Sequence, residues 1–118
     1  MGFNNTSKDV ALTAIGAAAT WISLHTADPT TTGGNECSAG AAPYARVQTT
    51  WGTAAASSMA GSQVTLQVNA GVTITHWGCW TVVTIGSGTF YEGGALPASE
   101  TYGGAGTYLL TPTLTATG

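Results

Sequence analysis

From about residue 20 onward, apolar and polar residues alternate in short segments that are separated by glycine, proline and asparagine. The clearest segment is 63–69, in which Val64, Leu66 and Val68 fall on one face. Successive side chains of a β-strand point to opposite sides of the sheet, so this alternation is typical of strands with one buried face. The pattern predicts about six or seven strands. They are expected at residues 21–26, 44–51, 63–69, 72–85 (one long strand, or two broken at Gly78), 89–91 and 107–115.

The connections between these segments indicate how the strands are arranged. None of them reads as a crossover helix, so we expect a mostly antiparallel sheet. Turn signals recur at the intervals of a β-sandwich. Pro112, inside the last segment, favours a sheet edge, and Gly93 and Gly94 are expected to end the segment 89–91. We therefore predict a mainly β chain that forms a small antiparallel β-sandwich or a jelly-roll-like barrel.

The first residues have a different pattern, which predicts a short helix at residues 7–18. Thr6 begins a stretch with the spacing of a capping box. Val10, Ala14 and Ala17 lie on one apolar stripe, which is expected to face the core. The boundaries that we expect are 1–118 for a single domain, with 1–19 as an N-terminal arm and short helix and 20–118 as the β-sandwich.

Charged side chains are scarce, with Lys and Arg numbering 2 and Asp and Glu numbering 5 among 118 residues, for a net charge of −3. A nucleic-acid partner requires clustered Lys and Arg, so we expect no nucleic-acid binding. We expect no membrane contact, because no run of about 20 apolar residues occurs, and synthesis in the cytosol, because the first residues are polar. A surface of Thr, Ser, Asn and Gly repels other copies only weakly, which suits a protein that packs against neighbours.

Few residues could carry chemistry. His25, Asp28 and His76 could be imagined around a metal ion, but the closely spaced ligand pairs of a zinc site are missing. The alternative is that Asp28 caps the turn before Pro29, while His25 is a half-buried strand residue. We favour that alternative and expect no metal, no cofactor and no catalytic residue. Structural roles also suffice for the acidic residues, which are Asp9, Asp28, Glu36, Glu92 and Glu100.

The two cysteines differ in their surroundings. Cys79 lies between Trp77 and Trp80 in an apolar segment and is expected in the core. Cys37 lies in the loop 30–43 and is expected to be exposed. A disulfide between the two is the alternative, although a cytosolic origin favours free thiols.

Aromatic and basic side chains supply the candidate interface. Alternation puts Trp77 and Trp80 on opposite faces of their strand. Either Trp80 is exposed as an interface anchor, or both faces are covered, one of them by the N-terminal helix. A stacking platform for sugars is the third alternative. Arg46 is expected to pair with a carboxylate, either Glu36 or one from a neighbouring chain. The interface candidates are Arg46, Trp80 and Tyr102.

Several stretches resemble a known family. Trp-Ile-Ser-Leu-His-Thr-Ala-Asp-Pro at 21–29 leads into Thr-Thr-Thr-Gly-Gly-Asn-Glu-Cys-Ser at 30–38 and Pro-Tyr-Ala-Arg at 43–46. The later stretches are Val-Thr-Ile-Thr-His-Trp-Gly at 72–78, Gly-Thr-Phe-Tyr-Glu-Gly-Gly-Ala-Leu at 88–96 and Glu-Thr-Tyr at 100–102. From about residue 20 onward the chain resembles small tailed-phage virion proteins, common in actinobacterial phages, that are described as head-decoration, minor capsid or tail-fibre proteins. The resemblance implies a β-rich structural protein without catalytic residues.

Low charge and this resemblance together favour a virion protein that is made in the host cytoplasm. Our leading hypothesis is a capsid decoration protein that cements subunits of the outer shell. Its expected partners are the major capsid protein and copies of itself, with a trimer as the expected oligomer. The alternative is a tail or fibre component that contacts the host surface. A third hypothesis is a small hydrolase that uses Cys37, His25 or one of the acids.

Overall fold

The computed structural model describes residues 3–37 and 43–117 of the chain, and this part is mainly β, as the sequence predicts. The elements in chain order are α1 (Asn5–Ala18), β1 (Trp21–His25), β2 (Val47–Gln48), β3 (Ser58–Ala60), β4 (Val64–Val68), β5 (Val72–Trp80), β6 (Phe90–Tyr102), β7 (Gly106–Leu110) and β8 (Thr113–Thr115). The predicted short N-terminal helix is therefore confirmed.

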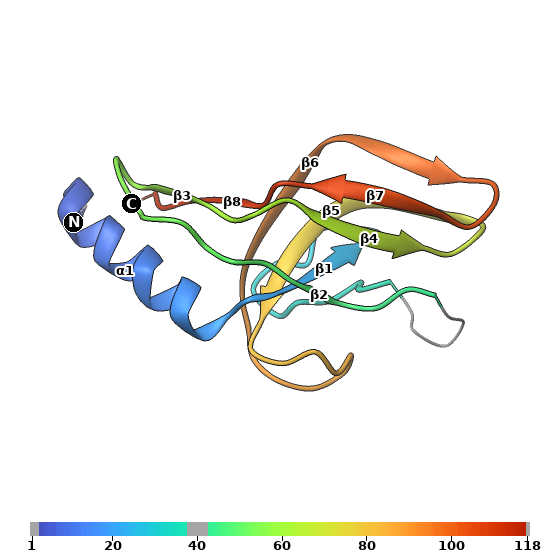
Figure 1. Ribbon diagram of the computed structural model, residues 1–118, viewed down its shortest axis with the longest axis horizontal. Helices are drawn as coiled ribbons and strands as arrows, with labels where there is room; N and C mark the ends of the chain where they lie inside the picture. The colour runs from blue at the N-terminus through green and yellow to red at the C-terminus, as the bar shows by residue number, and fades with distance from the viewer. Residues whose placement is uncertain (1–2, 38–42, 118) are drawn as a thin grey trace.

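The strands form three antiparallel sheets (Figure 1). The largest has the strand order β2-β1-β5-β6, and two smaller sheets pair β3 with β8 and β4 with β7. The prediction of antiparallel pairing is confirmed, because every one of these pairs is antiparallel. Among the described strands the sheets do not close on themselves, so the barrel alternative is not formed.

The core lies on the face of the large sheet that carries Ile22 and Leu24 of β1. Strand β4 contributes to the same cluster with its predicted alternation, in which Val64, Leu66 and Val68 are buried and the residues between them are exposed. An isolated two-stranded sheet is barely stable in water. The pair β4–β7 is held because its apolar face packs into this core.

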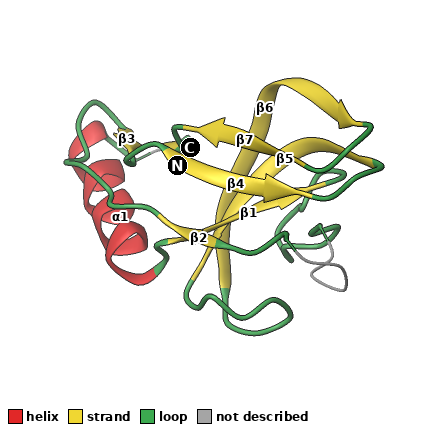
Figure 2. Cartoon of the chain, turned by 45° about the vertical axis from the view of Figure 1, so that its right-hand side comes forward, coloured by secondary structure: helices red, strands yellow, loops and turns green. Residues whose placement is uncertain are grey.

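Helix α1 begins and packs differently from the prediction. Its N-cap is Asn4, whose side chain accepts a hydrogen bond from the Ser7 amide at 2.8 Å, so the predicted capping box at Thr6 is wrong. Leu12 and Gly16 are the buried helix residues, whereas Val10 is 67% exposed. Both views place the helix at one end of the molecule, beside β3 and away from the face of the large sheet (Figure 1, Figure 2).

Gly16 explains why this face of the helix is buried. A Cβ at Gly16 would lie 2.8 Å from the Met59 methyl group and 3.2 Å from the Trp51 ring. The helix can approach β3 closely only where it has no side chain, and this contact turns the stripe of Val10, Ala14 and Ala17 outward. The prediction that this stripe faces the core is therefore wrong.

Strand β6 runs straight through Gly93 and Gly94, which were expected to end a strand. Gly93 pairs with Gly78 of β5, and Gly94 pairs with Trp77. A Cβ at Gly93 would overlap the carbonyl oxygen of Trp77. Glycine is needed there for the close approach of two backbones, which is a different use from a turn.

Three other strand predictions need correction. The segment 44–51 forms a strand only at residues 47–48, and β5 ends at Trp80 without a break at Gly78. The segment 107–115 is split at Pro112, so that β7 and β8 join different sheets. Pro112 donates no backbone hydrogen bond. Its carbonyl oxygen instead accepts one from the Gly61 amide at 2.8 Å.

Candidate functional site

Arg46 lies inside the chain, where its exposed fraction is 2%. It binds the Glu36 carboxylate through two hydrogen bonds, Nε to Oε2 at 2.9 Å and Nη2 to Oε1 at 2.8 Å. Its Nη1 group donates to the carbonyl oxygens of Val82 and Ser87 at 3.0 and 3.1 Å. Arg46 therefore finds its carboxylate partner within the chain, and the pair joins segments far apart in the sequence.

Trp80 packs on the other side of this arginine, with the guanidinium 3.8 Å from the ring centre. The Phe90 ring contacts the Trp80 indole edge to face, with 5.3 Å between the ring centres. A Cβ added at Gly33 would lie only 2.6 Å from the Trp80 ring. The exposed fraction of Trp80 is 8%, so the expectation that this side chain is exposed is wrong. Both faces of the strand are covered, but the second face is covered by loops rather than by the N-terminal helix.

The interface roles proposed for Arg46 and Trp80 stay predictions, and both residues are buried in the chain itself. Tyr102, the third candidate, lies half-buried at the end of β6. Its hydroxyl donates to the carbonyl oxygen of Thr107 at 2.9 Å, which fixes the ring across the turn to β7. Of the three candidates, Tyr102 is the most exposed.

Tyr44 belongs to the same buried cluster, although the sequence analysis did not single it out. Its hydroxyl donates to Glu36 Oε2 at 2.8 Å and accepts from the Leu24 amide at 3.1 Å. Burial, followed by the nearby Glu36 carboxylate, raises the pKa of Tyr44. The sequence feature that could have placed Tyr44 in this cluster is its position two residues before Arg46, because residues two apart in an extended segment point to the same face.

Ser23 and His25 form a hydrogen-bonded chain that begins at Trp80. The indole N–H of Trp80 donates to Ser23 Oγ at 2.9 Å, and Ser23 Oγ lies 2.7 Å from His25 Nε2. His25 Nδ1 lies 2.7 Å from the Gly34 carbonyl oxygen, which can only accept. Nδ1 therefore carries the proton, and Nε2 accepts from the serine hydroxyl. Burial lowers the pKa of His25, which is consistent with this neutral ring.

A serine beside a histidine is also the arrangement of an activated nucleophile. Here both side chains are 0% exposed, and the pair holds the loop around Gly34 against β1. His25 is fully buried rather than half-buried as predicted, and both of its nitrogens are used within the chain. Its hydrogen bonds are structural.

Both cysteines are free and buried. Cys79 is 0% exposed, which confirms its place in the core, and burial raises the pKa of its thiol to about 12. Cys37 was expected to be exposed, but it is buried because its amide donates to the Leu24 carbonyl oxygen at 2.9 Å beside β1. Burial raises the pKa of this thiol to about 11. The alternative of a disulfide is not formed.

The acidic side chains mostly have local structural partners. Asp28 accepts from the Thr30 amide at 2.8 Å, which confirms its predicted role in the turn. Asp28 also lines a shallow hollow of about 300 Å³ with His76 and Glu92. No group of three or more His, Cys, Asp and Glu side chains in residues 3–37 and 43–117 is arranged to hold a metal ion. Within the same residues, no helix has both the length and the apolar character needed to cross a bilayer.

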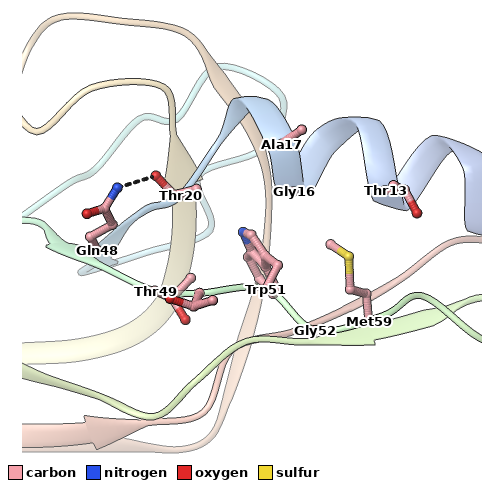
Figure 3. A pocket seen from close by; sticks show the side chains of 10 residues that line it. Thr13, Gly16, Ala17, Thr20, Gln48, Thr49, Trp51, Gly52 and Met59 are labelled. Atoms are coloured by element: carbon pink, nitrogen blue, oxygen red, sulfur yellow. Dashed lines mark hydrogen bonds between the residues drawn. The ribbon is translucent and has the colours of Figure 1, made fainter.

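A groove of about 460 Å³ lies between α1 and the chain that runs from β2 to β3 (Figure 3). No local sequence pattern indicates this groove, because its two walls are more than 25 residues apart in the chain. All of its lining side chains are uncharged. The groove is lined by Thr13, Gly16, Ala17, Thr20, residues 48–52 and Met59.

The walls of this groove are fixed by hydrogen bonds between them. The indole N–H of Trp51 donates to the Ala19 carbonyl oxygen at 2.8 Å, which ties the second wall to the end of the helix. Gln48 Nε2 donates to Thr20 Oγ1 at 3.1 Å across the end of the groove (Figure 3). Both side chains are therefore held in place before any ligand arrives.

A comparison with protein families places most of the chain within a known family model. A family model described as "Podophage GP4 fiber I protein gp80" matches residues 3–113. A comparison with curated proteins gives no match. The matched range includes the helix, the buried arginine cluster and both walls of the groove.

Proposed function

The chain belongs to the podophage GP4 fiber I protein family (gp80), and we propose that it is a fibre component that contacts the surface of the host cell. Membership of this family makes the chain a phage virion structural protein, which confirms the resemblance found in the sequence. The family description fits our alternative, a tail or fibre component, better than our leading hypothesis of capsid decoration.

The extent of the match is the observation that carries this proposal. It spans residues 3–113, so the likeness is not limited to one motif or one strand pair. The shape is consistent with a fibre module, since the molecule measures 44 × 27 × 24 Å. Helix α1 lies at one end of the long axis and the β4–β7 pair lies toward the other (Figure 1).

The proposed role is one of binding and assembly, without catalysis. The residues named in the hydrolase hypothesis support this reading, because His25 is fully buried and hydrogen-bonded on both sides. Burial also raises the pKa of Cys37, so its thiol is protonated at neutral pH and is a poor nucleophile.

Copies of the same chain are the partners that we propose within the virion. Large apolar side chains remain exposed at Phe3 and Val10 on the helical end, and at Tyr91 and Leu109 on the strands. The net charge is only −3 over 118 residues, so electrostatic repulsion between copies is weak. The major capsid protein would be the main partner only if the chain sits on the head.

Labelled virions test the location directly. Phage that carries a short epitope tag after Gly118 is incubated with gold-conjugated antibody and imaged by electron microscopy. We expect gold at the tail fibres, and purified chain is expected to reduce adsorption of untagged phage to host cells. Gold spread over the faces of the head would instead support capsid decoration and overturn the fibre proposal.

A further inference from the structure

We propose that the groove between α1 and the β2–β3 segment binds a neutral saccharide. The proposal rests on the proposed function, in which the chain meets the outside of a host cell. It adds the position of the site and the chemical class of the ligand, neither of which the family description states.

The charge of the groove favours an uncharged ligand. Every lining side chain is neutral, although the chain as a whole has a net charge of −3. A charged group that entered the groove would find no ionic partner among the lining side chains, so the groove offers nothing that favours a charged ligand over a neutral one. The hollow beside Asp28 and Glu92 has the opposite character, because its acidic side chains favour a cationic ligand.

The polar groups of the groove match a ligand with many hydroxyls. The Thr13 hydroxyl donates to the Asp9 carbonyl oxygen and can still accept, whereas the Thr20 hydroxyl accepts from Gln48 and can still donate. The Thr50 hydroxyl and the Gln48 amide add further polar groups to the lining. Among the described residues, the Gln48 carbonyl oxygen and the Thr50 hydroxyl have no hydrogen-bond partner. These two groups are therefore available to a ligand without breaking a bond inside the protein.

The apolar part of the groove is supplied by Trp51. Its N–H is already bound to the Ala19 carbonyl oxygen, so the exposed part of the ring offers mainly its apolar surface. A pyranose ring has C–H groups on its faces and hydroxyls at its edge. It can therefore pack its C–H groups on an indole while its hydroxyls reach polar side chains around it. A purely apolar ligand would leave the threonine and glutamine groups without water or partner.

The groove is preformed, which lowers the entropy lost on binding. Its walls come from α1, residues 48–52 and β3, and the hydrogen bonds of Trp51 and Gln48 fix their separation. Because Gly16 has no side chain, the helix can pack closely against Trp51 and Met59 at this point of the groove. A volume of about 460 Å³ lies within the usual range for small-molecule sites.

Ligand-observed NMR on the purified full chain tests this proposal. The probes are neutral mono- and disaccharides of glucose, galactose, mannose, arabinose and N-acetylglucosamine, with glucuronic acid and N-acetylneuraminic acid as charged counterparts. We expect saturation transfer to at least one neutral probe and none to the charged ones. We also expect that probe to shift the backbone amide signals of residues 48–52.

Two variants and a matched control connect binding to the groove. Thr50→Val removes a free hydroxyl at an exposed position, and we expect it to weaken binding about tenfold, the effect of losing one hydrogen bond. Gln48→Ala removes the free carbonyl oxygen together with the bond from Nε2 to Thr20, so we expect it to weaken binding at least as much. Gln67→Ala on β4 removes the same amide from an exposed site outside the groove and should leave binding unchanged. Urea unfolding of all three variants checks that the fold is intact.

Three results would overturn the groove proposal: no binding of any neutral probe, preference for the charged probes, or equal binding by Gln48→Ala, Thr50→Val and the wild type. The proposed function fails separately. If the chain blocks phage adsorption but binds no neutral saccharide, the fibre proposal stands and this inference falls. If the groove binds a saccharide while the gold label lies over the head, the fibre proposal falls.

Discussion

The guanidinium group of Arg46 lies 3.8 Å from the centre of the Trp80 ring, and each side chain helps to bury the other. Both were candidates for contact with a neighbouring protein. Within the chain, the hydrogen bonds of Arg46 to Glu36, Val82 and Ser87 join the loop that carries Glu36 to the segment 81–89. In a chain with few charges, this one ion pair therefore has a large structural role.

Replacing Arg46 with alanine should strongly destabilise the fold. Glu36 would keep a carboxylate whose exposed side-chain fraction is only 9% and would lose both charge-assisted hydrogen bonds. Removing one partner of a buried pair costs about 3 to 5 kcal/mol in the free energy of unfolding. Urea unfolding measures the change. Lys8→Ala, at the other basic residue, should stay within about 0.5 kcal/mol of the wild type. Equal effects of the two substitutions would contradict the role assigned to Arg46.

Acidic solution should weaken the fold through His25. Burial is the main cause that lowers its pKa, and Arg46 and His76 lower it further, while the Gly34 hydrogen bond and Glu36 act in the opposite direction. The unfolded chain therefore binds a proton near pH 6.5 that the folded chain does not. The free energy of unfolding should fall as the pH drops below about 6.5, by up to about 1.4 kcal/mol per pH unit, until the pKa of the folded state is reached.

Denaturant titrations at several pH values between 4.5 and 7.5 measure this loss. His25→Gln removes the titrating group and keeps a neutral side chain, so the variant should be less stable at neutral pH but should lose less stability on acidification. Contributions from carboxylates that do not interact with His25 are common to both proteins and cancel in the comparison. Parallel pH profiles for variant and wild type would show that His25 is not the source.

Glycine at position 93 is expected to be essential for pairing β5 with β6. A side chain there would overlap the Trp77 carbonyl oxygen, which is backbone and cannot rotate away. Gly93→Ala should lower the free energy of unfolding by about 3 kcal/mol, at the upper end for overpacking. Circular dichroism melting measures the loss. Gly103→Ala, where no heavy atom lies within 4 Å, is the matched control and should melt close to the wild type. An unchanged melting curve for Gly93→Ala would show that the strands are not in this register.

The two thiols should be unreactive in the folded protein. Cys37 and Cys79 are buried, and burial raises their pKa values to about 11 and about 12, so little thiolate exists at pH 7.5. Reaction with iodoacetamide, followed by mass spectrometry, should modify neither cysteine in native buffer and both in urea without prior reduction. Rapid labelling of Cys37 in native buffer would show that this thiol lies at the surface. If labelling in urea required prior reduction, Cys37 and Cys79 would be joined by a disulfide.

Features that depend on short stretches of sequence could be predicted. The alternation of β4 set which of its residues are buried, because side chains on opposite sides of a strand must meet different environments. The N-terminal helix and the core position of Cys79 followed in the same way. The resemblance from residue 20 onward indicated the family but not the place in the virion. Our leading hypothesis was capsid decoration, whereas the family description fits the fibre alternative better.

Features that depend on distant segments could not be predicted. Periodicity places Trp77 and Trp80 on opposite faces, but the covering of the second face depends on where Gly33 and Arg46 are brought by the fold. The local sequence around Gly93 predicts the end of a strand. Its role in the fold, which is to let β6 approach the Trp77 backbone closely, depends on a segment distant in the sequence. The groove likewise exists because Gly16 lets the helix approach Trp51. A local pattern describes the two sides of an element, whereas burial is created by whatever the rest of the chain packs against each side.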